Sequence, residues 1–149
     1  MKKFKYRLQA LLRVKEHIEK ERQKVHAVAV QKVHQQTDEL DRIHDSRQEN
    51  LSSQRRQMTQ HVSVAEMLVY SRYLTRLKRE QLAGTELLNV LKGEAEEKRV
   101  ELVAAAKDRR VLEKLKEKQS TKHHAEIDQA MTKENDEIAL ICHRRKEEG

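Results

Sequence analysis

The sequence predicts an all-α protein: a long antiparallel two-helix coiled coil, or α-hairpin, with a longer second helix and a C-terminal overhang. Composition is the first reason, because proline is absent and charged residues make up 38% of the 149 residues while aromatic residues make up 3%. Such a chain has too little apolar bulk for a thick core and is typical of coiled coils. The second reason is that apolar residues recur at steps of three and four in two long stretches, separated by one break.

The first helix is expected at about residues 5–51. Its apolar face is formed by Phe4, Leu8, Leu11, Ile18, Val25, Ala29, Val33, Leu40 and Ile43, broadened by Leu12 and Val14. The two consecutive steps of four from Val25 to Val33 form a stutter, which locally unwinds a left-handed supercoil. Polar residues such as Lys15 and Arg22 interrupt the face. We therefore expect this helix to depend on a partner helix for its stability.

The turn is expected at about residues 52–63, where the apolar pattern fades. Ser52 and Ser53 are poor residues for a helix interior, although no glycine or proline marks the turn. The start of the next helix is clearer. Ser63 and Glu66 have the spacing of a capping box, and Val62 can pack on Met67 as a hydrophobic staple.

The second helix is expected at about residues 64–119, with one coiled-coil seam along it. The seam residues are Met67, Tyr70, Leu74, Leu77, Leu88, Leu91, Ala95, Leu102, Ala105 and Leu112. Antiparallel pairing about a turn near residue 60 places Ile43 near Leu77, Ala29 near Leu91, Ile18 near Leu102 and Leu8 near Leu112. A register shifted by one heptad fits about equally well. The overhang, residues 120–149, has no sustained heptads and is expected to be a single exposed helix or disordered.

Residues 1–149 are thus expected to form one hairpin domain. The composition also restricts the partners and the cellular compartment of this domain. The net charge of +7 suits nucleic acid, acidic lipid or an acidic protein without choosing among them. Cys142 is the single cysteine, which excludes an intramolecular disulfide framework. No apolar run is long enough to span a bilayer, and charges interrupt what would be the apolar core of a signal peptide. We expect a cytoplasmic protein.

No constellation of residues favours catalysis, a metal or a cofactor. None of the eight histidines has another four residues away, and the adjacent His123 and His124 point in different directions on a helix. A two-helix rod offers no cleft that would desolvate a nucleophile or a carboxylate. The basic runs are short and acidic residues are interleaved throughout, which does not favour nucleic-acid binding. We expect no enzyme activity and name no catalytic, metal or cofactor-binding residue.

The aromatic residues lie at the two ends of the predicted rod. Phe4 and Tyr6 lie at the terminal end, and Tyr70 and Tyr73 lie near the tip. Tyr70 belongs to the seam, whereas Tyr73 lies one step off it and should be partly exposed. An exposed aromatic residue on a polar rod is a candidate binding hot spot, although single exposed aromatic residues are also common on protein surfaces.

Four segments together resemble the FliJ family, the small helical component of the bacterial flagellar type III export apparatus. They are FKYRLQALLRVKE, SVAEMLVYSRYLTRLK, LEKLKEKQ and NDEIALICHRR, and they occur in the order and spacing of that family. The resemblance covers nearly the whole chain. One departure is that many relatives have a glycine shortly before the second helix, where this chain has Gln60 and His61.

The resemblance implies a non-enzymatic stalk, similar to the gamma subunit of rotary ATPases, that enters the pore of the hexameric export ATPase and promotes its assembly or activity. It implies that Phe4, Leu8, Leu11 and Leu12, with the overhang, face the ATPase. It implies that Ile43, Tyr70, Tyr73 and Leu77 face the cytoplasmic domain of the membrane export gate. Export chaperones would be further partners, and membrane association at the cytoplasmic face of the inner membrane would be peripheral.

Two alternatives stay open at this point. The first is the equivalent small stalk protein of a virulence type III secretion system, which would share the same mechanism. The second is a generic coiled-coil scaffold or a nucleic-acid-binding helix pair. The sequence does not decisively separate the virulence system from the flagellar one, and we expect no nucleic-acid partner.

Overall fold

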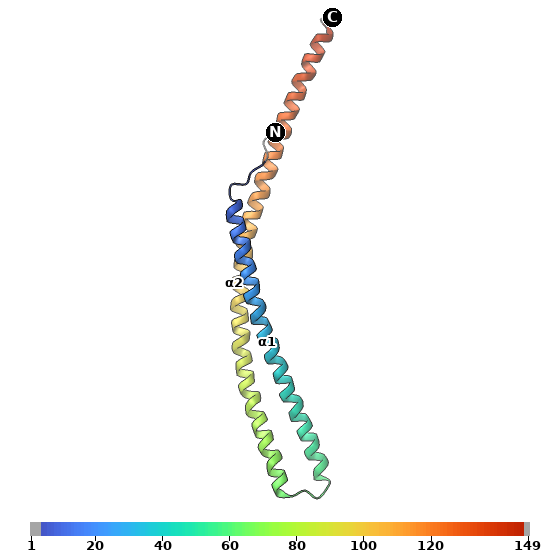
Figure 1. Cartoon of the computed structure of the whole chain (residues 1–149). Coiled ribbons are helices and arrows are strands. Elements are labelled where there is room, and N and C mark those ends of the chain that lie inside the picture. The colour runs from blue at the N-terminus through green and yellow to red at the C-terminus, as the bar shows by residue number, and fades with distance from the viewer. Residues whose placement is uncertain (1–3, 148–149) are drawn as a thin grey trace. The chain divides into compact units, whose positions relative to one another are not determined.

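The computed structural model describes residues 4–147, and two long helices make up most of them. Helix α1 spans Gln9–Met58, 50 residues, and helix α2 spans Val64–Glu147, 84 residues. The helices pack against each other in opposite directions and are joined by a short loop, which confirms the predicted α-hairpin (Figure 1). The chain divides into two compact units. The terminal unit combines the chain up to Glu19 with the chain from Ala104, and the hairpin unit contains Lys20–Val103.

The start of α2 is fixed by the predicted capping box. The amide of Ser63 donates to Glu66 Oε2 at 3.1 Å, and the amide of Glu66 donates to Ser63 Oγ at 3.2 Å. Val62 and Met67 line the same small recess at the tip, as a hydrophobic staple requires. Two free amide groups at the helix start are therefore satisfied locally, without a glycine or a proline.

The helix ends differ from those expected from the sequence. Helix α1 begins at Gln9, after an irregular segment, and it continues through Ser52 and Ser53 to Met58. The loop is therefore residues 59–63. Half-burial of Leu51 and Gln54 carries the helix past the two serines, because packing outweighs a weak propensity. Helix α2 continues through the expected overhang to Glu147.

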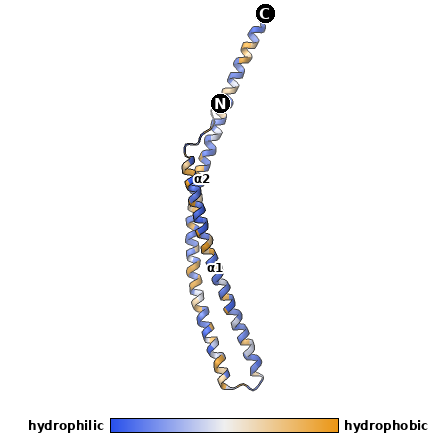
Figure 2. Ribbon diagram, viewed as in Figure 1, coloured by the Kyte–Doolittle hydropathy of each residue, from blue (hydrophilic) through white to orange (hydrophobic). Residues whose placement is uncertain are grey.

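The seam predicted for α2 faces α1. Every residue of that seam is buried or half-buried, and Leu77 and Ala105 are the most deeply buried. The core is correspondingly thin. Most of both ribbons is hydrophilic, and hydrophobic stretches are short and recurrent (Figure 2). This is the distribution of a coiled coil, in which a narrow apolar stripe is enough to hold two helices.

The helices approach closely at Gly84, which is buried in the seam of the hairpin unit. Gln36 Nε2 donates a hydrogen bond to the carbonyl of Gly84 at 3.1 Å, and Leu40 packs beside it. The expected register placed Gly84 opposite Gln36, and these two residues are in contact. It also placed Arg22 opposite Lys98, whereas in the structure Arg22 pairs with Glu101, three residues further along α2. The observed register therefore lies within about one helical turn of the expected one.

Candidate functional site

In the terminal unit, charged residues on α1 form ion pairs with charged residues on α2. Lys15 Nζ lies 2.8 Å from Asp108 Oδ2. Arg109 donates to the carboxylates of both Glu19 and Glu113. These hydrogen bonds, first to Glu19 and then to Glu113, raise the pKa of Arg109 above its ordinary value. The face that α1 turns toward α2 in this unit is thus more ionic than apolar.

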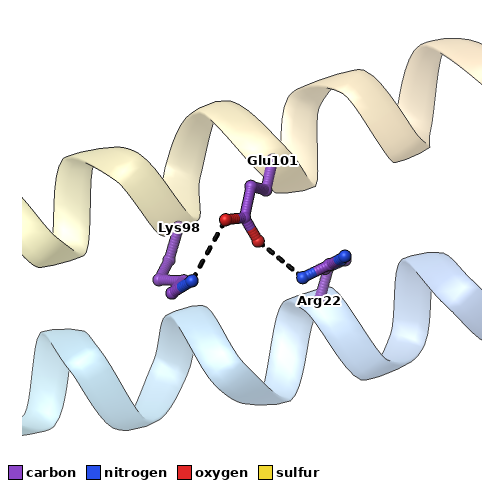
Figure 3. Close-up of polar contacts among 3 residues, drawn as sticks. All are labelled: Arg22, Lys98 and Glu101. Atoms are coloured by element: carbon purple, nitrogen blue, oxygen red, sulfur yellow. Dashed lines mark hydrogen bonds and ion pairs between the residues drawn. The ribbon is translucent and has the colours of Figure 1, made fainter.

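The same pattern continues at the start of the hairpin unit. Glu101 on α2 accepts hydrogen bonds from Arg22 Nη1 at 2.6 Å and from Lys98 Nζ at 3.0 Å, one on each carboxylate oxygen (Figure 3). The bond from Lys98 is the main cause that lowers the pKa of Glu101 below its ordinary value. Glu101 therefore links the two helices as a bridging carboxylate.

The inward side of α1 differs from the face predicted from its apolar residues. The prediction placed Leu8, Leu11 and Ile18 on the α1 face that packs on its partner helix. In the structure Leu12 is buried at 3% exposure and half-buried Lys15 and Glu19 follow it at coiled-coil spacing, whereas Leu11 is 43% exposed. The predicted face was wrong here, because the inward side of α1 combines Leu12 with Lys15 and Glu19, which form ion pairs with α2. An apolar band is left exposed, which we call the terminal stripe: Leu8, Leu11, Val14 and Ile18.

The four residues expected to face an ATPase fall into two groups. Leu8 and Leu11 are exposed members of the terminal stripe. Leu12 is buried, and Phe4 is half-buried with its ring 5.6 Å from that of His123. Sequence reasoning did not single out Val14 and Ile18 as site residues. Ile18 could have been found, because it lies one heptad after Leu11.

Tyr6 also has a role that sequence reasoning missed. Its ring is buried and its hydroxyl donates to the carbonyl of Leu112 at 3.0 Å. Phe4 and Tyr6 thus attach the irregular segment before α1 to α2 within the terminal unit. A buried tyrosine usually finds such a partner for its hydroxyl. The sequence shows that Tyr6 is an aromatic residue near the chain start, but it does not show that Tyr6 is buried.

The four residues expected to face an export gate also differ in exposure. Tyr73 is 40% exposed on α2. Ile43 and Tyr70 are half-buried and Leu77 is 4% exposed. Tyr70 lines the small recess at the tip together with Met58 and Val62. Of these four residues, Tyr73 alone offers a large accessible side chain, and the others hold the hairpin together.

The outer side of α2 near the tip carries a second feature that sequence reasoning missed. Arg72, Arg76 and Arg79 line an open groove of about 320 Å³ together with Ser71 and Thr75. Arg76 Nε donates to Glu80 Oε1 at 2.8 Å, and this hydrogen bond is the main cause that raises the pKa of Arg76 above its ordinary value. The three arginines are separated by steps of four and three, which places them on one face of a helix. This spacing can be read from the sequence.

Metal-ligand clusters and membrane-spanning helices are both absent from the described residues. Within residues 4–147, no three His, Cys, Asp or Glu side chains gather where they could hold a metal ion. Neither α1 nor α2, as far as they are described, contains an apolar segment of the length and hydropathy needed to cross a bilayer.

Comparison with protein families matches residues 4–148 to the family described as Flagellar FliJ protein. Comparison with curated proteins and comparison with solved structures give no match. The family match spans both helices and the loop between them, so it includes the terminal stripe and Tyr73. The chain therefore belongs to the FliJ family of flagellar export proteins.

Proposed function

We propose that this protein is a non-enzymatic stalk of the bacterial flagellar export apparatus that inserts its terminal unit into the hexameric export ATPase. The observation that carries the proposal is the terminal stripe. Leu8, Leu11 and Ile18 are exposed while charged residues occupy the face toward α2. Apolar side chains left outside a polar two-helix pair are expected to be covered by another protein.

The stalk promotes assembly or activity of the ATPase by a mechanical and allosteric route. Polar residues on the inner face of α1 hold the two helices in register, and the apolar residues on the outer face remain available to a partner. Binding energy from the leucines would then favour those conformations of the ATPase subunits that accept the stalk. No step requires a catalytic group on the stalk itself.

The tip couples the ATPase to the cytoplasmic domain of the membrane export gate and hands over export chaperones. Tyr73 is the contact residue in this proposal, because its side chain is the accessible one among the four candidates. Ile43, Tyr70 and Leu77 support the hairpin that presents it. Contact with the gate would keep the protein at the cytoplasmic face of the inner membrane without insertion.

The test is the hydrolysis rate of the cognate export ATPase, titrated with this protein. We expect stimulation by the wild type. The double variant Leu8→Ala, Leu11→Ala should need at least about tenfold more protein for the same effect, because each leucine buried in an interface contributes more than about 1 kcal/mol. Leu12 is left unchanged so that the packing of the two helices is preserved.

A control variant removes two exposed apolar side chains elsewhere. Leu87→Ala, Val90→Ala changes two exposed residues in the hairpin unit and should stimulate the ATPase like the wild type. Circular dichroism must show the same helix content for all three proteins. Equal loss in both double variants, or no stimulation by the wild type at any ratio, would contradict the proposed contact.

A further inference from the structure

Positive charge is concentrated around the tip of the hairpin. Residues 51–79 contain six arginine or lysine residues and one glutamate, a net charge of +5 out of +7 for the whole chain. The basic residues are Arg55, Arg56, Arg72, Arg76, Lys78 and Arg79, and the acidic one is Glu66. Glu66 lies at the start of α2, where it accepts a hydrogen bond from the amide of Ser63.

The arginines of α2 share the outer face of the helix with exposed apolar residues. Two rows of residues run along this face with a spacing of seven residues. One row is Leu68, Thr75 and Leu82, and the other is Arg72 and Arg79. Both rows lie on the side of α2 away from the seam. Leu68, Val69 and Leu82 are each more than half exposed. Between Met67 and Thr85 the one carboxylate is Glu80, which pairs with Arg76. We call this set the outer tip face: Leu68, Val69, Arg72, Arg76, Arg79 and Leu82.

We propose that the outer tip face binds directly to the surface of a bilayer that contains anionic phospholipids. A guanidinium group binds a phosphate oxygen pair through two parallel hydrogen bonds. The two rows of the face repeat at about 10 Å along the helix axis, so several arginines can reach lipid phosphates at once. The helix lies along the membrane surface and does not cross it.

The exposed leucines favour a bilayer over a nucleic acid. A helix that lies on a membrane presents basic residues to the headgroups and places leucine and valine side chains among the acyl chains. The phosphate backbone of a nucleic acid offers no apolar phase to receive Leu68 and Leu82. An apolar and basic mixture on one side of a single helix is therefore matched best by a flat, anionic, partly apolar surface.

This inference does not depend on the contact with the ATPase. The outer tip face belongs to the hairpin unit, whereas the terminal stripe belongs to the terminal unit. The proposed gate contact already keeps the protein at the membrane, and this inference adds a direct contact with lipid. If the wild type stimulated the ATPase but did not bind anionic vesicles, the lipid contact would be overturned and the stalk function would be unaffected.

The experiment measures sedimentation of the full chain with vesicles. One set of vesicles contains phosphatidylglycerol and phosphatidylcholine in equal parts, and the other contains phosphatidylcholine alone. We expect binding to the first set only, weakening as salt rises because the charges are screened. Each arginine removed should weaken binding about fivefold. The triple variant Arg72→Gln, Arg76→Gln, Arg79→Gln should therefore weaken binding on the order of 100-fold.

Two further variants separate the outer tip face from general electrostatics. Arg13→Gln, Arg144→Gln, Arg145→Gln removes the same charge from exposed positions outside the hairpin unit and should bind vesicles within about twofold of the wild type. Leu68→Ser, Leu82→Ser keeps every charge and should weaken binding by at least about tenfold. Circular dichroism serves to confirm that each variant keeps its helix content.

Three outcomes would overturn the inference. The first is absence of wild-type binding to the anionic vesicles. The second is equal weakening by the two triple arginine variants, which would show that net charge alone drives binding. The third is tighter binding to duplex DNA than to the vesicles at the same salt concentration, with the same dependence on Arg72, Arg76 and Arg79, which would make nucleic acid the partner of this face.

Discussion

Gly84 lies so close to Leu40 that a Cβ atom added at residue 84 would come within 2.8 Å of Leu40 Cδ2. The same Cβ would lie 3.0 Å from Gln36 Nε2, the atom that donates to the Gly84 carbonyl. The other internal glycine differs, because nothing lies within 4 Å of a Cβ added at Gly93. One glycine thus permits close approach of the helices, and the other is simply a weak residue in an exposed part of α2.

The two glycines should therefore respond differently to alanine. Gly93→Ala should raise the free energy of unfolding by up to about 1 kcal/mol, the difference in helix propensity. Gly84→Ala should raise it by less, because the ends of the Leu40 and Gln36 side chains must shift to admit the Cβ and this repacking offsets part of the same gain. Urea unfolding followed by circular dichroism measures both values. Equal stabilisation by the two alanines would show that the helices are not in close contact at Gly84.

Adjacent leucines at the start of α1 should differ in the same assay. Leu12→Ala should lower the free energy of unfolding by about 2–4 kcal/mol, because a buried leucine is removed from the contact with α2. Leu11→Ala should change it by less than about 0.5 kcal/mol, because that side chain is already exposed. A larger effect at Leu11 than at Leu12 would mean that α1 packs on its other face.

The capping box should matter for the first turn of α2. Ser63→Ala removes the acceptor for the Glu66 amide and should lower the free energy of unfolding by about 1 kcal/mol. Ser52→Ala is the control, because Ser52 is exposed inside α1 and alanine is the better helix residue. Hydrogen exchange should speed up in the first turn of α2 for the first variant alone. Unchanged exchange there would mean that the loop holds the helix start without the serine.

Stability should depend on pH through Glu101. The pKa of Glu101 is lower in the folded protein than its ordinary value of 4.5, first because of the hydrogen bond from Lys98 and then because Lys98 and Arg22 attract the carboxylate. A carboxylate of this kind stabilises the fold above its unfolded pKa, and the contribution disappears as pH falls through the folded pKa. We therefore expect the wild type to lose stability below about pH 4.5.

The variant Glu101→Gln tests this dependence. It should be less stable than the wild type at neutral pH, and the gap should close in acid because the protonated glutamate no longer pairs with Arg22 or Lys98. Glu97→Gln, at an exposed position on the same helix, is the control. Thermal unfolding across a pH series measures the difference, and a gap that persists in acid would exclude ionisation as its cause.

The α2 seam and the capping box could be predicted from the sequence because their signals are local and unambiguous. Leucines at steps of three and four, such as Leu88 and Leu91, leave one possible inner face for α2. Ser63 and Glu66 have the spacing that reciprocal capping requires. For these features a single helix contains all the information needed.

The inner face of α1 could not be predicted in the same way. Two faces of this helix compete near its start, one through Leu11 and Ile18 and the other through Leu12 and Glu19. Lys15 and Glu19 on the second face pair with Asp108 and Arg109, which lie about ninety residues further along the chain. A pattern within one helix identifies an apolar stripe, but it does not reveal whether that stripe meets the partner helix in the same chain or a different protein.

From Asp128 to Glu147 every side chain of α2 is exposed, including Met131, Ile138 and Ile141. A helix without tertiary packing is only marginally stable in water, so this segment opens far more often than the paired helices do. Proteases cut chains at such openings. A partner that covers the segment would therefore protect it, and the lifetime of the intact chain would indicate whether the protein has been assembled.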